Sequence, residues 1–309
     1  MTRPTPSLVL EADTLSARTR TGAVLSALRP RQWIKNLLVV AAPLAAGRLG
    51  NLHVVAGVIA AFGAFCLVSS SVYLLNDVYD AEQDRLHPIK RQRAIATGEV
   101  SVPTAITLSV LLAGLSIALA WWWAPTLGVT VLTYAGLQLT YLLSLKHQPG
   151  LDLAAVASGF LLRAVAGGNS TGTTLSAWFL LVATFGALFV VAGKRHSELS
   201  RHGDQAGTRH SLKGYTETYL RFIWTLAAGV TVMVYLLWAL TGRNAPDTAQ
   251  GTDWAAISVA PFVLGVLRYA ATIDGGDAEA PEDLVLSDRH LQVIGVIWLL
   301  LLVCHATGL

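Results

Sequence analysis

Residues 52–84 read LHVVAGVIAAFGAFCLVSSSVYLLNDVYDAEQD, and this stretch decides the fold. Its first 24 positions, 52–75, are predominantly apolar. An α-helix rises about 1.5 Å per residue, so a run of this length crosses the roughly 30 Å hydrocarbon core of a bilayer. Four polar side chains then follow in quick succession: Asn76, Asp77, Asp80 and Asp84. The stretch therefore predicts a membrane-spanning helix that ends in a group of carboxylates.

Apolar runs of similar length recur along the whole chain. Of the 309 residues, 53% are hydrophobic and only 13% are charged, and the mean hydropathy is +0.54. Soluble domains carry about 25% charged residues, so this composition excludes an ordinary cytosolic fold. We expect an all-α polytopic membrane bundle of about nine transmembrane helices. The predicted spans are 33–47, 52–76, 103–123, 126–145, 151–168, 174–193, 218–241, 254–272 and 290–307.

The basic residues predict how the chain lies in the membrane. Residues 1–28 are rich in Thr, Ser and Arg and lack an apolar run long enough for a signal peptide, so we expect a flexible cytoplasmic tail. Residues 29–309 then form a single transmembrane domain. With the N-terminus inside, 19 of the 22 Lys and Arg residues lie in or beside cytoplasmic segments, the exceptions being Arg48, Arg163 and Arg243. The positive-inside rule therefore favours a multi-pass protein with the carboxylates on the cytoplasmic side. We expect its location to be the plasma (inner) membrane.

The carboxylates after the second predicted span share one helix face. At 100° per residue, Asp80 and Asp84 lie about 60° and 20° from Asp77. Asn76 lies about 100° away on the same side, whereas Glu82 points away from the group. Clustered carboxylates repel one another unless a cation neutralises them, and Mg²⁺ prefers such oxygen ligands and bridges to phosphates. We interpret Asn76 and the three aspartates as ligands of Mg²⁺; the alternative is a solvated helix end.

Four bases follow the carboxylates closely: Arg85, Lys90, Arg91 and Arg93. They offer counter-charges for phosphate, and we prefer Lys90 and Arg93 for that role. The positive-inside bias alone could also place them there. Together, the acids and bases predict a site for a metal-bound phosphate substrate. The net charge of +3 is too small to predict nucleic acid as a partner.

The pattern Asn-Asp-x-x-Asp-x-x-x-Asp, at the end of the second predicted span, resembles that of the UbiA superfamily of intramembrane prenyltransferases. The resemblance covers nearly the whole chain in topology. It implies that the first acidic motif binds a substrate diphosphate through Mg²⁺, that a Tyr/Lys motif follows the fourth span, and that a second Asp-x-x-x-Asp motif follows the sixth. Tyr141 and Lys146 match the Tyr/Lys motif, with one extra residue between them.

The segment after the sixth predicted span departs from that pattern. It reads Gly193-Lys194-Arg195-His196-Ser197-Glu198, so bases stand where the resemblance implies acids. A prenyl diphosphate carries its charge at one end, whereas a sugar with a diphosphate and a second phosphate needs an additional cationic pocket. The candidates for that pocket are Lys146, Arg163, Lys194 and Arg195, and Ser197 and Glu198 join them as expected substrate-binding residues.

Two further segments narrow the resemblance to one branch of the superfamily. They are Arg29-Pro30-Arg31-Gln32-Trp33-Ile34-Lys35-Asn36 and Leu145-Lys146-His147-Gln148-Pro149. That branch transfers 5-phosphoribose from phosphoribosyl diphosphate to a long-chain polyprenyl phosphate, such as decaprenyl phosphate, for cell-wall arabinan precursors. The resemblance thus implies these two substrates, membrane lipids as surroundings, and a catalytic role for the transmembrane domain.

Two bases have competing interpretations. Arg163 lies about 18 Å along the fifth predicted span, near the middle of the membrane, where a charge is costly and marks a candidate functional site. We prefer a phosphate ligand, and the alternative is an ion pair with another helix. Lys35 follows Trp33 at the start of the first span, where a phosphate ligand and an interfacial anchor are equally good interpretations.

The implied chemistry is glycosyl transfer. Asp77, Asp80 and Asp84 are the expected catalytic residues, because they hold Mg²⁺ on the diphosphate as it leaves the anomeric carbon. The acceptor phosphate is already an anion, so positioning matters more than a general base. The alternatives are a prenyltransferase that joins a prenyl diphosphate to an aromatic or lipid acceptor and, in a different class, a lipid or metabolite transporter.

The rest of the chain gives weaker signals. The acidic stretch 274–288 shows no catalytic pattern, and we interpret it as a solvated loop. Gly167-Gly168 is interpreted as the stop of the fifth span. The family resemblance suggests a homo-oligomer.

Overall fold

The computed structural model describes residues 20–202, 214–241 and 253–307. Within these ranges the chain is helical and has no strand, which confirms the predicted all-α class. Eight helices are long and apolar enough to cross a membrane, and each matches one of the predicted spans from the second to the ninth. They are α3 (Leu52–Tyr79), α5 (Val102–Trp123), α6 (Pro125–Leu143), α7 (Leu151–Thr171), α8 (Ala177–His202), α9 (Glu217–Thr241), α10 (Trp254–Asp274) and α12 (Arg289–Thr307).

The first predicted span, 33–47, is not a regular α-helix. A 3₁₀ helix, η2 (Pro30–Val40), leads into the short helix α2 (Ala41–Ala45). A 3₁₀ helix rises about 2.0 Å per residue, so the two segments together extend for roughly 30 Å, the thickness of the hydrocarbon core. The described part of the structure therefore has eight regular spans, and the first predicted span corresponds to this irregular segment.

Glycine lets η2 pack closely against α7. A Cβ on Gly167 would lie 1.9 Å from the carbonyl oxygen of Val39, near the end of η2, so only glycine fits there. The interpretation of Gly167-Gly168 as a helix stop is wrong, because α7 continues beyond both and ends at Gly172, which is left-handed with φ of 61°. Close packing, rather than termination, explains the glycine at 167.

The prediction of a flexible tail over residues 1–28 extends too far along the chain, because a helix begins at Arg20. Its first 19 residues lie outside the described ranges, but α1 (Arg20–Ala27) is a helix. Ala23 and Ala27 are buried and pack in one cluster with Leu74 of α3. This short apolar face docks α1 near the end of α3 that carries the carboxylates, although it is far too short to be detected as a span.

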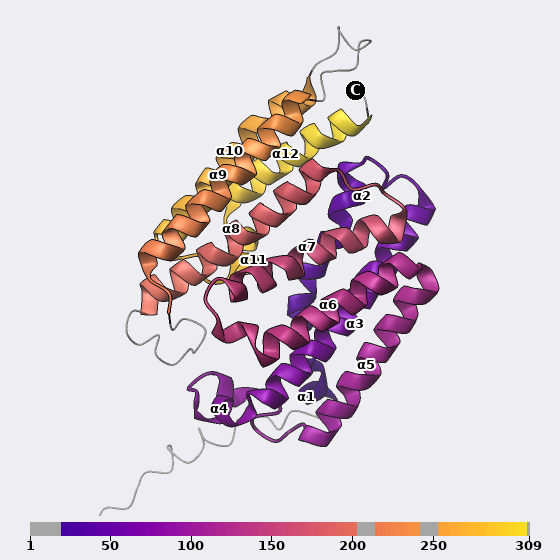
Figure 1. Ribbon diagram of the computed structural model, residues 1–309, viewed down its shortest axis with the longest axis vertical. Coiled ribbons are helices and arrows are strands. Elements are labelled where there is room, and N and C mark those ends of the chain that lie inside the picture. Colours follow the sequence, from indigo (N-terminus) through magenta and orange to yellow (C-terminus); the bar gives the residue numbers. More distant parts are fainter. Residues whose placement is uncertain (1–19, 203–213, 242–252, 308–309) are drawn as a thin grey trace, which may run out of the picture.

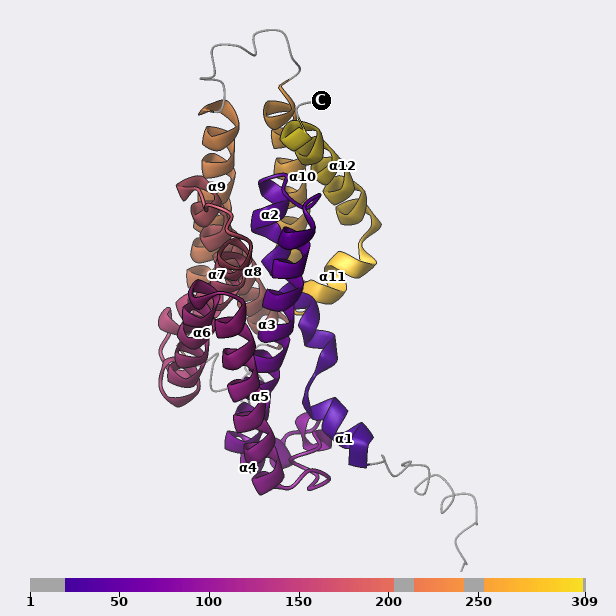
Figure 2. The ribbon, with the colours of Figure 1, turned by 90° about the vertical axis from the view of Figure 1, so that its right-hand side faces the viewer.

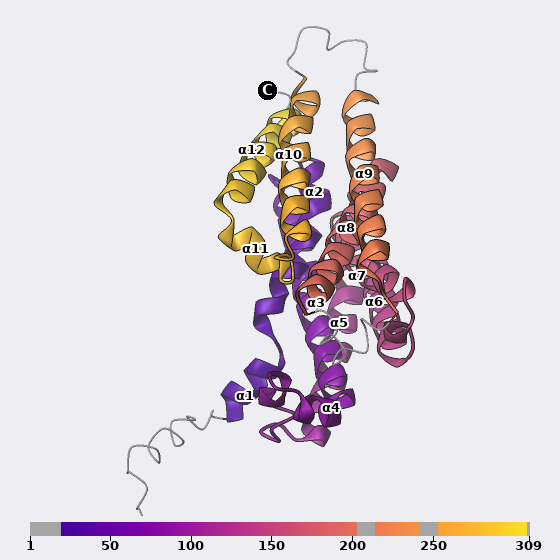
Figure 3. The same cartoon turned by 90° about the vertical axis from the view of Figure 1, so that its left-hand side faces the viewer.

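The long helices form two groups that lie side by side (Figure 1). α3, α5, α6 and α7 pack with η2 around a core that includes Phe65, Leu127 and Tyr134. α8, α9, α10 and α12 form the second group, with Phe189 and Tyr269 in its core, and contacts between α7 and α8 join the two groups. The turned views place α1 and the short helix α4 (Ala81–Leu86) at one end of the molecule and α2 with the end of α12 toward the other (Figure 2 and Figure 3).

Candidate active site

The carboxylates lie where α3 turns into the short helix α4 (Ala81–Leu86). Asp77 is in the last turn of α3, Asp80 occupies the junction, and Asp84 follows in α4. The Asp80 backbone N–H donates to a carbonyl one turn earlier at 2.9 Å, so helical winding continues through the junction. Asp77 and Asp84 are 4% and 3% exposed, whereas Glu82 is exposed. Glu82 thus points away from the group, as the helix-face arithmetic predicts.

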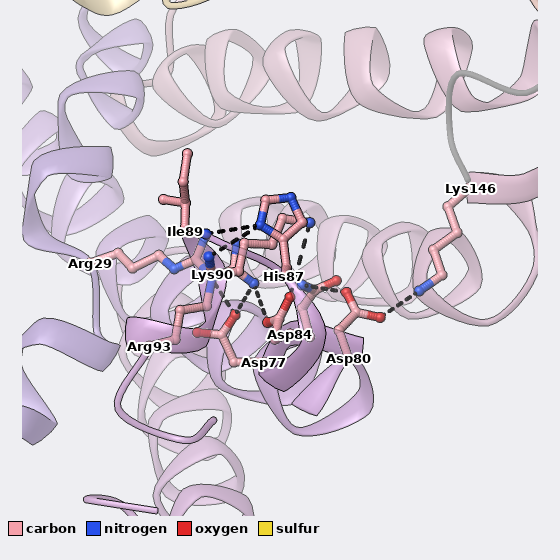
Figure 4. A network of polar contacts seen from close by, with 10 residues as sticks. Arg29, Asp77, Asp80, Asp84, His87, Ile89, Lys90, Arg93 and Lys146 are labelled. Atoms are coloured by element: carbon pink, nitrogen blue, oxygen red, sulfur yellow. Dashed lines mark hydrogen bonds and ion pairs between the residues drawn. The ribbon is translucent and has the colours of Figure 1, made fainter. Parts of the chain in front are cut away.

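Guanidinium groups hold the two buried carboxylates (Figure 4). Arg93 Nη1 donates to Asp77 Oδ1 at 3.0 Å and to Asp84 Oδ2 at 2.6 Å. Arg29 Nη2 donates to the same Asp77 oxygen at 2.5 Å. Lys90 Nζ lies 4.0 Å from Asp84 Oδ1. The predicted counter-charges Lys90 and Arg93 therefore lie beside the acids, where they compensate negative charge that is costly to bury alone.

Asp80 is the carboxylate that faces open space. Asn76 Nδ2 donates to Asp80 Oδ2 at 3.1 Å, and Lys146 Nζ donates to its Oδ1 at 3.0 Å. Lys146 also lies over the Tyr79 ring, 4.3 Å from the centroid, in a cation–π contact. It belongs to the short 3₁₀ helix η4 (Leu145–His147) between α6 and α7. The Tyr/Lys segment and the acidic motif are thus parts of one cluster.

A cavity of about 840 Å³ opens beside this cluster, within the size range of small-molecule sites. The predicted site residues that line it are Lys35, Asn76, Asp80, Lys90, Arg93, Tyr141, Lys146, Lys194, Arg195 and Glu198. Asp77 and Asp84 do not line the cavity, but both hold Arg93, which does. The fold therefore brings residues from four separate parts of the sequence to one space.

The α8 part of the cavity wall carries a second group of charges. Arg195 Nη1 lies 3.2 Å from Glu198 Oε2, and its Nη2 lies 3.5 Å from Asp152 Oδ2 on α7. Lys194 Nζ lies 3.9 Å from Glu198 Oε1. Tyr141 of α6 lies next to Arg195. The bases predicted to replace a second acidic motif thus share a cavity with the first acidic motif.

Asp152 and Tyr215 support this wall, and the sequence pattern did not reveal them. Tyr215 donates its hydroxyl proton to Asp152 Oδ1 and accepts the Gly150 N–H at 2.6 Å. Burial, and then the hydrogen bond to the Asp152 carboxylate, raise the pKa of Tyr215, so the phenol stays protonated and keeps donating. The hydrogen bond from Tyr215 orients the Asp152 carboxylate, which in turn holds Arg195. No motif links two residues 63 positions apart, so only the fold shows that they meet.

Arg29 belongs to one of the segments that narrow the family resemblance, but it was not predicted to be a site residue. It lines the cavity, and its guanidinium lies 4.9 Å from the centroid of the Tyr73 ring. With φ of 53°, it is the one non-glycine residue in the described ranges with a left-handed backbone. That conformation costs about 1 kcal/mol for a non-glycine residue, and the ion pair with Asp77 offsets the cost. Strain of this kind often marks a functional site.

Arg163 does not line the cavity, contrary to its interpretation as a phosphate ligand. It is 5% exposed, and its Nε donates to Asn36 Oδ1 at 2.7 Å. Its Nη2 donates to the Tyr134 hydroxyl at 2.9 Å and its Nη1 to the Gly159 carbonyl at 2.8 Å. These partners carry no charge, so the ion-pair alternative is not supported either. Arg163 joins η2, α6 and α7 through neutral hydrogen bonds.

Ser197 also lies outside the cavity lining, although it was expected to bind substrate. It is fully buried, and its hydroxyl donates to the Ile273 carbonyl at 3.3 Å and accepts the Ala278 N–H at 3.3 Å. Ser197 therefore connects α8 to the end of α10 and to the chain that follows it.

The remaining lining of the cavity is mainly apolar. The apolar and aromatic residues are Ile34 and Leu38 of η2, Val156 and Phe160 of α7, Val190 and Val191 of α8, Tyr269 of α10, and Pro281, Val285 and Leu286 of the short helix α11 (Pro281–Ser287). A cavity with charged groups on one part of its wall and apolar groups on the rest can hold a molecule with an anionic head and a hydrocarbon body.

The donor chemistry of the first motif suits Mg²⁺. Asp80 and Asn76 offer oxygen atoms at the cavity, and Asp77 and Asp84 lie within one helical turn of Asp80. In the described part of the chain, no three acidic, histidine or cysteine side chains already surround a common point. Bases hold the carboxylate oxygens there instead. The residues fit the ion by donor type, and the buried acids require positive charge in any case.

Known proteins resemble this chain over most of its length. The UbiA prenyltransferase family matches residues 36–302. A decaprenyl-phosphate phosphoribosyltransferase from Mycolicibacterium smegmatis is 48% identical over 287 residues, which cover 89% of this chain and 90% of the relative. Proteins of the same name from Mycobacterium tuberculosis and Corynebacterium glutamicum are 47% and 46% identical, and the matches cover 89% and 91% of this chain and 91% and 85% of the relatives.

Solved structures share the fold. A UbiA homolog from Archaeoglobus fulgidus, bound to DMAPP and Mg²⁺, matches 92% of this chain and 98% of its own with a TM-score of 0.69 at 19% identity. A UbiA homolog from Aeropyrum pernix K1 matches 88% of this chain and 98% of its own with a TM-score of 0.62 at 17% identity. At these identities the likeness concerns the fold alone.

Proposed function

The chain belongs to the UbiA prenyltransferase family, and we propose that it transfers 5-phosphoribose from phosphoribosyl diphosphate to decaprenyl phosphate or a similar long-chain polyprenyl phosphate, releasing diphosphate. One observation carries the proposal: the acidic motif at Asp80 and the basic pair Lys194 and Arg195 line one cavity. A sugar donor with a diphosphate and a separate phosphate matches two such groups. The names of three relatives that are 46–48% identical over most of this chain support this substrate pair.

We assign the donor's diphosphate to the first motif and its 5-phosphate to α8. Lys90, Arg93 and Lys146 supply positive charge beside the diphosphate position. Lys194 and Arg195 supply it for the 5-phosphate, and Asp152 and Glu198 orient the Arg195 guanidinium. Lys35 lines the same cavity and is a further candidate phosphate ligand.

The transfer exchanges one bond to C1 of the ribose for another. The bond between C1 and a diphosphate oxygen breaks, and a bond between C1 and an oxygen of the acceptor phosphate forms. That acceptor oxygen is already anionic, so no side chain has to remove a proton from it. Lys146 and Arg93 stabilise the negative charge that gathers on the leaving diphosphate. We expect inversion at C1 through a transition state with oxocarbenium character.

Asp77, Asp80, Asp84 and Asn76 are the residues that would hold Mg²⁺. When bound, the ion neutralises diphosphate charge and makes it a better leaving group. The backbone of the α3–α4 junction keeps the four side chains within two helical turns, and Arg29 and Arg93 hold Asp77 in place.

The acceptor's hydrocarbon part is assigned to the apolar lining. Ile34 and Leu38 of η2, with Val285 and Leu286 of α11, offer contacts for the first isoprene units. The first motif, Lys146 and Lys194 all lie at or just after the ends of predicted spans that the basic residues predict to be cytoplasmic. We propose that residues 29–309 form the catalytic domain, in the plasma membrane, with the cavity open to the cytoplasmic side.

Prenyl transfer to an aromatic or lipid acceptor is the weaker proposal. It uses one diphosphate, and it gives no reason for Lys194 and Arg195 to face the cavity. A direct test incubates purified protein with labelled phosphoribosyl diphosphate, decaprenyl phosphate and Mg²⁺, and in parallel with a labelled prenyl diphosphate and an aromatic acceptor. Labelled lipid is expected in the first reaction. Product in the second reaction alone would overturn the proposal.

Adding a chelator to the same assay tests the assignment of Mg²⁺. Excess EDTA should abolish formation of the labelled lipid, and excess Mg²⁺ should restore it, because the diphosphate leaves poorly without a neutralising cation. Undiminished transfer in EDTA would refute the metal assignment while leaving the substrate assignment intact.

A further inference from the structure

The acidic stretch 274–288 is docked onto α8 and is not a freely solvated loop. α10 ends at Asp274, and the residues that we call the corner, 275–280, lead into α11. Arg201 of α8 pairs with Asp277, and its Nε lies 3.9 Å from Glu279 Oε1. Two acids that show no catalytic pattern in the sequence, Asp277 and Glu279, therefore have a structural position against α8.

A buried serine fixes the corner. The Ser197 hydroxyl bridges the Ile273 carbonyl and the Ala278 N–H, at 3.3 Å from each. Ser197, Ile273 and Ala278 all have no exposed surface. One side chain of α8 thus bonds the backbone just before the corner and the backbone within it.

The contact continues along one face of α8. A Cβ on Gly193 would lie 2.3 Å from Ile273 Cδ1, so glycine allows α10 to approach. Gly193, Ser197 and Arg201 are four residues apart and therefore share a helix face. Lys194 and Glu198 follow one position later and line the cavity. α8 presents one face to the donor pocket and the neighbouring face to the corner.

Ser197 should contribute more to this contact than Arg201 does. The Arg201 and Asp277 side chains are 54% and 62% exposed, and an exposed ion pair contributes little to stability. Removing the Ser197 hydroxyl would leave the Ala278 N–H without its partner in a buried place, which is more costly.

The corner positions a wall of the cavity. α11 follows it directly, and Pro281, Val285 and Leu286 of α11 line the cavity. Val285 and Leu286 are 52% and 62% exposed, so other parts of the protein leave most of their surface uncovered. Their uncovered apolar surface suits a hydrocarbon chain better than a sugar phosphate.

We propose that Ser197 is a positioning residue for the lipid acceptor, because it fixes the corner and thereby the α11 wall against which the acceptor's hydrocarbon part packs. This inference rests on the proposed function. Ser197 acts through α11 and does not touch the donor, although it lies next to two residues assigned to donor binding.

Steady-state kinetics with each substrate varied in turn tests the proposal. Ser197→Ala should raise the KM for decaprenyl phosphate about fivefold or more and leave the KM for phosphoribosyl diphosphate within about twofold of wild type. The matched control is Ser116→Ala, since Ser116 is equally buried and donates to the Ala64 carbonyl at 2.7 Å, between α5 and α3. It should change neither KM.

Leu286→Ala tests the wall itself, and its side chain is exposed enough for the variant to fold. It should raise the acceptor KM alone, and combining it with Ser197→Ala should raise that KM by less than the product of the two single effects. An unchanged acceptor KM in Leu286→Ala, or equal rises of both KM values in Ser197→Ala, would overturn the inference. If wild-type protein forms no labelled lipid, the proposed function itself fails and this inference falls with it.

Discussion

Two charged regions face one cavity with opposite patterns. At the α3–α4 junction, Asp77 and Asp84 are buried and held by bases that come from elsewhere in the chain. On α8 the bases are presented to the cavity, and Lys194 has a 36% exposed side chain. The acids there, Glu198 and Asp152, are 3% and 1% exposed and pair with these bases.

The difference indicates what each region binds. Buried carboxylates need positive charge, so the junction suits a cation and, through it, a diphosphate. Bases with acid partners are oriented but keep donors for an anion, so α8 suits a phosphate without a metal. A family member with acids in both places would handle one diphosphate from two sides. Under the proposed function, the second region of this protein would bind a second phosphate on the donor.

Removing one junction carboxylate should have the largest effect on activity, and it tests the role assigned to the junction. Asp80→Asn keeps the shape of the side chain but removes a negative charge at the cavity, so kcat/KM should fall by about 10³-fold or more. Glu82→Gln is the matched control, because Glu82 lies two residues away but is exposed and points elsewhere. Initial rates of labelled lipid formation measure both variants. Equal losses in the two would show that charge near the junction, and not the cavity carboxylate, is what matters.

A base on α8 should have a smaller and more selective effect. Lys194→Ala should raise the KM for phosphoribosyl diphosphate about 10- to 50-fold and leave the acceptor KM nearly unchanged, because one charge-assisted phosphate contact is lost. Arg221→Ala serves as control, since Arg221 is an exposed base that pairs with Asp274 at 3.4 Å and does not line the cavity. A donor KM that stays at the wild-type value in Lys194→Ala would refute the second phosphate pocket.

Much of the fold could be predicted because membrane insertion is a local property of sequence. A run of about 20 apolar residues has to form a helix in the bilayer, since the backbone has no other partners there, and the eight regular spans follow from this rule. This rule did not predict the irregular form of η2, because its 3₁₀ winding and its approach to Gly167 depend on contact with α7. The rule also did not predict α1, because this helix is short and is held in place by two buried alanines.

Local sequence pattern predicts the acidic motif, and the family resemblance predicts cavity residues far from it in sequence, such as Lys146 and Lys194. Asn76, Asp80 and Asp84 follow from helix geometry alone. Arg29 reaches Asp77 across 48 positions, and Tyr215 reaches Asp152 across 63, so no local pattern contains either pair. A charge in the middle of a predicted span indicated that Arg163 lies within the helical bundle. It did not indicate the neutral groups that Arg163 contacts, since a side chain's direction depends on neighbouring helices.

A substitution of Arg163 has the smallest expected effect, and it tests whether a further base belongs to the phosphate sites. The Arg163 guanidinium donates to three neutral acceptors from three different nitrogen atoms, a spacing that the single ammonium nitrogen of lysine cannot reproduce. Arg163→Lys should therefore lower the free energy of unfolding by about 1–3 kcal/mol, seen as a lower melting temperature in detergent. The donor KM should stay within about twofold of wild type, because no donor contact is lost. A donor KM that rises as much as in Lys194→Ala, with unchanged melting, would return Arg163 to the phosphate pocket and extend that pocket toward η2.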